Sequence, residues 1–223
     1  MAQATTLRPG QIRHLLRVTN GTSRHPDRDC LILLLGITCG MRISEIAQIE
    51  VQDVLFPSGA IRTEVSLRAN VTKGCKQRCV YLTNRLTIDA LDRYLAHRLE
   101  RGHGTELVND RYRGLSSQTK LILKQGGGSF CMNTKRRVNY GGDRIDYAAA
   151  DSLQSHVTRL YKDAGITLGS SHSGRRSFAS NLLAKGTDLE TVAQLLGHAD
   201  IECSLPYLEV DPRKLREMFA VVI

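Results

Sequence analysis

The sequence predicts a mainly α-helical protein with a small antiparallel β-sheet. Most apolar residues recur every three or four positions, which places them along one face of a helix. Between residues 61 and 82 the interval falls to two, as in β-strands. The chain has 223 residues, of which 41% are hydrophobic, so it is long enough to bury one sizeable core. Because the sequence contains no internal repeat and no clear linker, we expect a single domain over residues 1–223.

Three helices are expected in the first fifty residues. Pro9 suits the first turn of a helix, because its fixed φ is helical and it has no N–H to leave unpaired. A second, more apolar helix extends from about Asp27 to Thr38, and Gly40 breaks its pattern. In the segment MRISEIAQI, a short helix begins at Arg42 and Glu45 lies one turn further on. The side chains of Arg42 and Glu45 should therefore be neighbours.

Two extended segments follow. Apolar and polar residues alternate from Ile61 to Leu67, and RCVYL at 78–82 is a second extended run after the polar, glycine-containing TKGCKQ. This pattern predicts a small antiparallel sheet. Helical spacing then returns in a set of apolar residues, namely Leu86, Ala90, Leu91, Tyr94 and Leu95.

The stretch from Arg111 to Arg144 is strongly basic. It holds eight basic residues against the single acidic Asp143, three consecutive glycines at 126–128, and the run Lys135, Arg136, Arg137. A flexible, solvated basic face and a loop that follows DNA are equally good interpretations of this stretch taken alone.

Helical patterns resume after this stretch. One helix is indicated by Leu153, Val157 and Leu160, a second by SGRRSFASNLLAKG, and a third ends at Gly197, immediately before His198. Asp211 and Pro212 have the pattern that begins a helix, so we expect a terminal helix over about 212–223.

Composition indicates the kind of partner. Lys and Arg total 31 against 22 acidic residues, which gives a net charge of +9 and a pI near 9.5. Such an excess favours a polyanion, with nucleic acid as the first candidate and a membrane surface as the second. The longest apolar run, 31–35, is too short to cross a bilayer, and no export signal is present. The six cysteines are scattered, which indicates reduced thiols in a cytoplasmic protein and no zinc site.

Several polar residues could form one site, although each alone is ordinary. His172 and Arg175 are one helical turn apart, Arg42 opens a helix, and Lys73 lies at the turn between the two strands. His198 and Tyr207 are nine residues apart near the end of the chain. The combination and order of these six residues are more informative than any one of them.

Four motifs carry a resemblance to a known family. The sequence contains, in this order, the motifs CGMRISEI, TKGCKQRCVYL, HSGRRSFASNLL and LLGHADIECSLPYL. Through these motifs and their order it resembles the tyrosine recombinase, or phage integrase, family. The resemblance covers about residues 6–210, the catalytic core. It implies a mainly helical fold with a three-stranded sheet, and DNA strand exchange through a covalent 3′-phosphotyrosine.

The resemblance assigns six catalytic residues, and chemistry agrees with it. Arg42 and Arg175 can each donate two parallel hydrogen bonds to phosphate oxygens. Lys73 can protonate the leaving oxygen, whereas His172 and His198 can bind phosphate or relay protons. The nucleophile would be Tyr207. Glu45 would support Arg42 as its charge partner. No cofactor, metal or water is required.

The expected partner is double-stranded DNA, bound by a homo-oligomer that is a tetramer in the synapse, with accessory DNA-bending proteins. Further DNA contacts are expected from Lys76, Lys135, Arg136, Arg137 and Arg176. The terminal helix should dock on a neighbouring protomer, with docking on its own protomer as the alternative. Arg42 occurs too early for a preceding DNA-clamping domain, so the chain resembles either a short, naturally single-domain recombinase or a catalytic fragment of a larger integrase.

Two other functions fit the same motifs. A type IB topoisomerase uses similar residues to relax supercoils without sequence preference. A DNA-binding regulator could keep the fold without catalysis, although such a protein would not need Tyr207.

Overall fold

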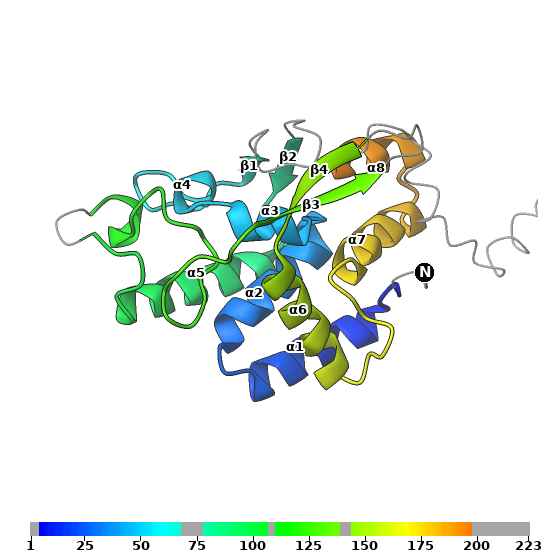
Figure 1. Ribbon diagram of the computed structural model, residues 1–223, viewed down its shortest axis with the longest axis horizontal. Coiled ribbons are helices and arrows are strands. Elements are labelled where there is room, and N and C mark those ends of the chain that lie inside the picture. The colour runs from blue at the N-terminus through cyan, green and yellow to red at the C-terminus, as the bar shows by residue number, and fades with distance from the viewer. Residues whose placement is uncertain (1–4, 68–77, 107–109, 139–143, 198–223) are drawn as a thin grey trace, which may run out of the picture.

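The computed structural model describes residues 5–67, 78–106, 110–138 and 144–197, which form a mainly helical fold (Figure 1). The helices are α1 (Pro9–Thr22), α2 (Pro26–Cys39), α3 (Ile43–Gln48), α4 (Val51–Val54), α5 (Arg85–Glu100), the 3-10 turn η1 (Arg111–Gly114), α6 (Asp151–Asp163), α7 (Ser173–Ala184) and α8 (Leu189–Leu196). The strands are β1 (Glu64–Leu67), β2 (Arg78–Tyr81), β3 (Asn133–Val138) and β4 (Arg144–Ala149).

Helix α2 forms the centre of the molecule. Its sequence is apolar on nearly all sides, and every residue from Arg28 to Ile37 is buried. A helix of this kind must be covered all round, and α2 packs against α1, α5 and α7, with smaller contacts to α3 and α6 (Figure 1).

The contact between α2 and α7 is unusually close. A Cβ atom built on Gly174 of α7 would lie 3.1 Å from the carbonyl carbon of Gly36 of α2, so the two backbones touch without an intervening side chain. This contact fixes the position of α7, which begins directly after His172 and contains Arg175.

The expectation of one three-stranded sheet is wrong for the described residues, which contain two separate two-stranded sheets. Strands β1 and β2 pair antiparallel, with Val65 opposite Val80, as the alternating pattern predicts. Strands β3 and β4 form the second antiparallel pair, with Lys135 opposite Tyr147. The side chains of this second pair are largely exposed on both faces, so it has no apolar alternation that would reveal it in the sequence.

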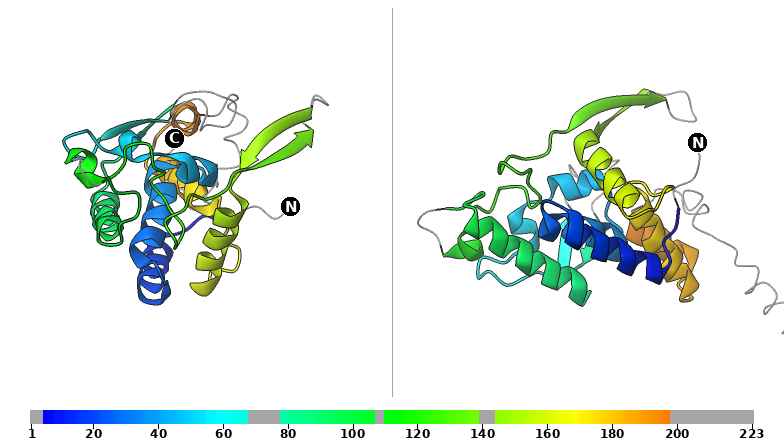
Figure 2. Two further views of the ribbon diagram at one scale, coloured as in Figure 1. Left: turned by 60° about the vertical axis from the view of Figure 1, so that its left-hand side comes forward. Right: turned by 90° about the horizontal axis from the view of Figure 1, so that it is seen from below.

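The β3–β4 hairpin projects away from the helices (Figure 2). One ion pair joins β3 to α6: Lys135 Nζ lies 2.5 Å from Asp151 Oδ1. A second joins the two strands: Arg136 Nε on β3 lies 2.7 Å from Asp146 Oδ1 on β4. Part of the basic stretch is therefore a β-hairpin, which neither sequence interpretation included.

Helices α7 and α8 share a small apolar cluster separate from the main core. Ala179, Val192 and Leu196 are buried in it, with Phe178 packed against them. Helix α8 also contacts β2. Within the described ranges, no helix has both the length and the apolar character needed to cross a membrane.

Candidate active site

A sharp turn between α2 and α3 positions the first residue of the candidate site, Arg42. Gly40 ends α2 with φ +61°, in the left-handed region that favours glycine. A Cβ atom here would also lie 2.6 Å from Phe178 Cδ1. The turn brings Arg42 to the N-cap of α3, which agrees with the helix start expected from the sequence.

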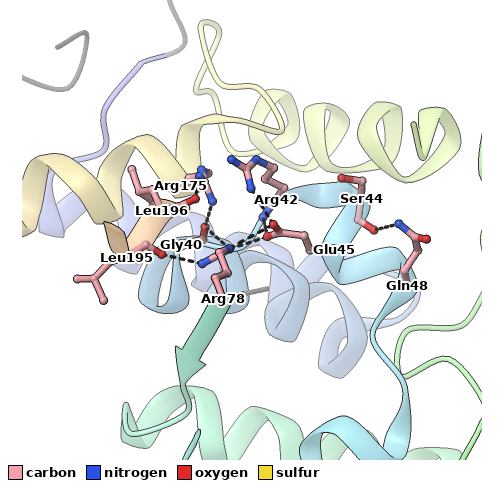
Figure 3. Close-up of polar contacts among 9 residues, drawn as sticks. All are labelled: Gly40, Arg42, Ser44, Glu45, Gln48, Arg78, Arg175, Leu195 and Leu196. Carbon is pink, nitrogen blue, oxygen red and sulfur yellow. Dashed lines mark hydrogen bonds and ion pairs between the residues drawn. The ribbon is translucent and has the colours of Figure 1, made fainter. Parts of the chain in front are cut away.

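Glu45, one turn into α3, is fully buried against Arg42. Its Oε2 accepts a hydrogen bond from the Arg42 backbone N–H at 2.7 Å, and its Oε1 accepts one from Arg42 Nη1 at 2.8 Å. Glu45 therefore holds both the backbone and the side chain of Arg42 (Figure 3).

Arg78, the first residue of β2, is a member of the site that the sequence reasoning missed. Its Nη2 donates to Glu45 Oε2 at 2.6 Å and its Nε to Glu45 Oε1 at 3.3 Å. The same guanidinium donates to the carbonyl oxygens of Leu195 at 2.8 Å and Gly40 at 3.3 Å (Figure 3). The sequence places Glu45 beside Arg42, but it carries no signal that a second arginine reaches the same carboxylate.

Arg175 joins the same cluster from α7. Its Nη1 donates to the Gly40 carbonyl at 2.6 Å, and its Nη2 donates to the Leu196 carbonyl (Figure 3). Gly40 thus accepts from both Arg78 and Arg175, and the end of α8 accepts from both as well. Four segments far apart in the sequence meet at this point.

The electrostatics of the cluster centre on Glu45. Burial would raise the pKa of this carboxyl, but the charge and hydrogen bonds of Arg78, followed by the charges of Arg175 and Arg42, lower the pKa below its usual value. Glu45 is therefore ionised, and three guanidiniums around one carboxylate leave a formal excess of two positive charges. Such an excess suits a phosphodiester.

The neighbouring predicted residues differ in exposure. His172 is exposed at the N-cap of α7, with its Nδ1 3.3 Å from Ser171 Oγ. Arg176 is buried, and its Nε donates to Thr6 Oγ1 at 3.3 Å. Arg175 is equally buried, so the difference lies in direction: Arg176 points to Thr6 and away from the Glu45 cluster, which gives no support to the expectation that it contacts DNA. Lys135 and Arg136 are exposed on β3, to which Arg137 also belongs.

The remaining predicted residues lie outside the described ranges. They are Lys73, Lys76, His198, Tyr207 and the terminal helix expected over 212–223. The described part of the chain ends at Gly197, which terminates α8 with φ +62° and directly precedes His198 in the sequence.

A pocket of about 330 Å³ lies elsewhere, at the opposite end of α2. Arg24, His25, Arg98 and Arg101 are among its lining residues, but it contains none of the predicted catalytic residues. We place the candidate site at the Glu45 cluster, because arginines from three of the four motifs converge there, whereas the pocket contains none of them.

The sequence as a whole identifies the class of protein. The profile of the phage integrase family matches residues 5–214. The chain therefore belongs to the phage integrase family.

Individual relatives agree with this assignment. The tyrosine recombinase XerD of Agrobacterium fabrum is 30% identical over 218 residues, which make up 97% of this chain and 55% of that protein. The tyrosine recombinase XerA of Pyrococcus horikoshii is 28% identical over 190 residues, or 85% of this chain and 53% of that protein. The chain thus spans about half the length of the curated relatives that it matches.

Solved structures show the same fold. The XerA recombinase crystal structure superposes with a TM-score of 0.66 at 20% identity, covering 97% of this chain and 62% of that one. A post-cleavage complex of the XerH site-specific recombinase with a palindromic difH substrate gives 0.65 at 22% identity, covering 99% and 54%. The catalytic domain of bacteriophage HP1 integrase gives 0.51 at 18% identity, covering 99% and 96%. The expected mainly helical catalytic-domain fold is confirmed.

Proposed function

We propose that this chain cleaves and rejoins DNA as a site-specific tyrosine recombinase. The observation that carries the proposal is the convergence of Arg42, Arg78 and Arg175, from three separate motifs, around the single buried carboxylate of Glu45. Family membership and relatives that are named tyrosine recombinases support it.

The proposed reaction is a transesterification. The Tyr207 hydroxyl attacks the phosphorus, a 3′-phosphotyrosine bond forms, and the bond to the 5′ oxygen of the next nucleotide breaks. Lys73 supplies a proton to that oxygen. Arg42 and Arg175 stabilise the charge that grows on the non-bridging oxygens, and His172 and His198 assist by hydrogen bonding or proton transfer. The reverse attack by a DNA hydroxyl rejoins the strand.

Arg42 is suited to reach the phosphate. Its side chain is 21% exposed, whereas that of Arg78 is 5% exposed, so Arg42 presents guanidinium surface while Arg78 remains inside. The bonds from Glu45 hold Arg42 in one orientation before DNA arrives, which reduces the cost of ordering its side chain on binding.

The DNA itself is proposed to be bound as a duplex. The proposed phosphate contacts outside the catalytic centre come from four basic residues. Three of them, Lys135, Arg136 and Arg137, belong to the β3–β4 hairpin, and the fourth is Lys76. We further propose that the protein acts in the cytoplasm as a tetramer on paired sites, with accessory DNA-bending proteins, and that residues 212–223 dock on a neighbouring protomer.

Trapping of the covalent intermediate tests this function. A pool of nicked duplexes with randomised sequence is incubated with the protein, and adducts that survive denaturation are isolated and sequenced. We expect adducts at one preferred sequence, undiminished by EDTA, and none from Tyr207→Phe. Because affinity comes mainly from phosphate contacts elsewhere, Tyr207→Phe should still bind the duplex.

Other outcomes have a clear meaning. Adducts spread evenly over all sequences would indicate a topoisomerase. An absence of adducts despite tight duplex binding would indicate a regulator. Adducts from the Tyr207→Phe protein would place the nucleophile at another tyrosine.

A further inference from the structure

Arg78 is placed where the parts of the candidate site meet, although none of the expected catalytic roles belongs to it. We propose that Arg78 is a positioning residue that fixes the Arg42–Glu45 turn relative to the end of α8, from which the chain continues to His198. This inference rests on the proposed function and extends it to a residue that does not touch the phosphate.

The hydrogen bonds of Arg78 link three segments. Its guanidinium donates to both carboxylate oxygens of Glu45, to the Gly40 carbonyl in the α2–α3 turn, and to the Leu195 carbonyl in the last turn of α8. These acceptors lie 33, 38 and 117 residues away in the sequence. A planar guanidinium can donate hydrogen bonds to all of these acceptors at once, whereas a lysine ammonium cannot reproduce the bidentate contact with Glu45.

The stem of the Arg78 side chain also supports the end of α8. A Cβ atom built on Gly197 would lie 2.8 Å from Arg78 Cδ, so the residue immediately before His198 sits directly on this side chain. Gly197 has φ +62°, a conformation that only glycine adopts readily. Removal of the arginine would therefore take away both a hydrogen bond to α8 and the surface on which its end rests.

The charge of Arg78 controls the state of Glu45. The charged groups that face this carboxylate are Arg42 from α3, Arg78 from β2 and Arg175 from α7, and Arg78 contributes the largest share of the charge stabilisation. Without Arg78, the pKa of Glu45 should rise. A protonated Glu45 can no longer accept from both the backbone and the side chain of Arg42, so cleavage should fall at mildly acidic pH.

The chain offers a matched control in Arg28. This arginine is as buried as Arg78, and its Nε donates to the buried carboxylate of Asp29 at 2.8 Å and its Nη1 to the Leu123 carbonyl at 3.3 Å. Like Arg78, it is a buried arginine that bonds a buried carboxylate and a backbone carbonyl, but it lies at the other end of α2. A purely structural effect of losing a buried arginine should therefore appear equally in both variants.

The experiment compares Arg78→Met, Arg78→Lys and Arg28→Met with the unchanged protein. Single-turnover adduct formation is measured on the trapped duplex, well below the melting temperature of each protein, together with duplex affinity. We expect Arg78→Met to cleave about 10²-fold more slowly, the size of loss that a small misplacement of catalytic groups produces, with duplex affinity nearly unchanged. Arg28→Met should cleave at the normal rate.

The pH profile separates charge from geometry. Arg78→Met should lose activity at a higher pH than the unchanged protein as the pH is lowered. Arg78→Lys should restore the normal pH profile, because the charge returns, but not the full rate, because one ammonium cannot hold Glu45 and α8 together. Arg78→Lys also keeps the test valid should the methionine variant fold poorly.

A second readout does not depend on catalysis. Amide hydrogen exchange in α8 should accelerate at least several-fold in Arg78→Met and remain normal in Arg28→Met, since Arg78 donates to the Leu195 carbonyl of α8 whereas Arg28 donates to Asp29 and Leu123. Normal exchange in α8, or cleavage by Arg78→Met equal to that of Arg28→Met, would overturn the inference. An unchanged protein that forms no adduct would instead contradict the proposed function, and the exchange measurement would still decide the role of Arg78.

Discussion

The two ends of α2 each hold a buried arginine–carboxylate contact, and they differ in how the carboxylate is balanced. At the N-terminal end, Asp29 is held by Arg28, the neighbouring residue, and by His156 from α6 at 2.9 Å. At the C-terminal end, three guanidiniums from three elements surround Glu45. Both carboxylate side chains are fully buried, so burial does not distinguish them.

The difference lies in the charge that remains after each carboxylate is paired. Burial would raise the pKa of Asp29, but the bonds from His156 and Arg28 lower it, so Asp29 is ionised as Glu45 is. One arginine matches the charge of Asp29, whereas the Glu45 cluster retains excess positive charge with Arg42 partly exposed. Positive charge beyond that of its own carboxylate is thus present at the Glu45 cluster, where we propose that the phosphodiester binds.

The largest expected effects are losses of catalysis. Lys73→Ala should slow cleavage roughly 10²- to 10⁴-fold, as removal of a general acid does. Arg175→Lys should slow it about 10²- to 10³-fold, since one of the donors to the growing negative charge is lost. Replacement of the 5′ bridging oxygen by sulfur, which leaves without a proton, should restore cleavage by Lys73→Ala but not by Arg175→Lys.

Lys76→Ala is the control for that measurement. It should weaken duplex binding and reduce the salt dependence of that binding. It should still cleave the ordinary substrate, in which the 5′ bridging atom is oxygen. Rescue of Lys76→Ala in place of Lys73→Ala would reassign the acid, and rescue of Arg175→Lys would remove the arginine from phosphate stabilisation.

The two ends of α2 can be compared by replacing each buried carboxylate with its uncharged amide and measuring the free energy of unfolding. Glu45→Gln and Asp29→Asn should each lower the free energy of unfolding by about 3–5 kcal/mol, because each leaves buried arginine charge uncompensated. Only Glu45→Gln should also impair cleavage, since only Glu45 holds Arg42. Equal cleavage by the two variants would show that the ends of α2 do not differ in function.

The same pair predicts a pH dependence. Both folded-state pKa values are lowered, so the stabilisation is fully present above the ordinary values of 4.5 for Glu45 and 3.8 for Asp29, and is lost as the pH falls through the lowered values. The stability gap between the unchanged protein and each variant, measured by urea unfolding, should therefore narrow as the pH drops below about 4.5 and 3.8, respectively. A constant gap would mean that the carboxylates act only through shape.

The smallest expected effect lies on the β3–β4 hairpin. Its ion pairs are partly exposed and therefore weak, so Lys135 and Arg136 can exchange Asp151 and Asp146 for phosphate at little cost. Lys135→Ala and Arg136→Ala should each lower the salt slope of duplex binding by about 1. Lys162→Ala, at an exposed position on α6, is the control and should leave the slope unchanged. An equal change in Lys162→Ala would indicate general charge attraction in place of a hairpin contact.

Local features of the fold were predictable from the sequence. The left-handed turn at Gly40, the start of α3 at Arg42 and the neighbouring position of Glu45 all follow from spacings of a few residues. The β1–β2 pair follows from its alternation. The β3–β4 hairpin does not, since strands that are exposed on both faces carry no such pattern.

Long-range contacts were not predictable. Arg78 lies in an ordinary strand segment, and its importance depends on acceptors as far as 117 residues away. Arg175 and Arg176 look equivalent in the sequence, but one residue turns a helix by about 100°. Arg175 therefore reaches Gly40, while Arg176 is directed to Thr6.

The close backbone contact of Gly36 and Gly174 limits how far α7 can shift beside the proposed site. A methyl group on Gly174 would meet the Gly36 backbone at 3.1 Å, tighter than an ordinary contact, whereas one on Gly36 would meet Gly174 Cα at 3.7 Å, a normal distance. Relief of the first contact moves α7 by a few tenths of an ångström, and Arg175 is the next residue along that helix. The accuracy with which this guanidinium is held thus depends on a missing methyl group in an apolar interface.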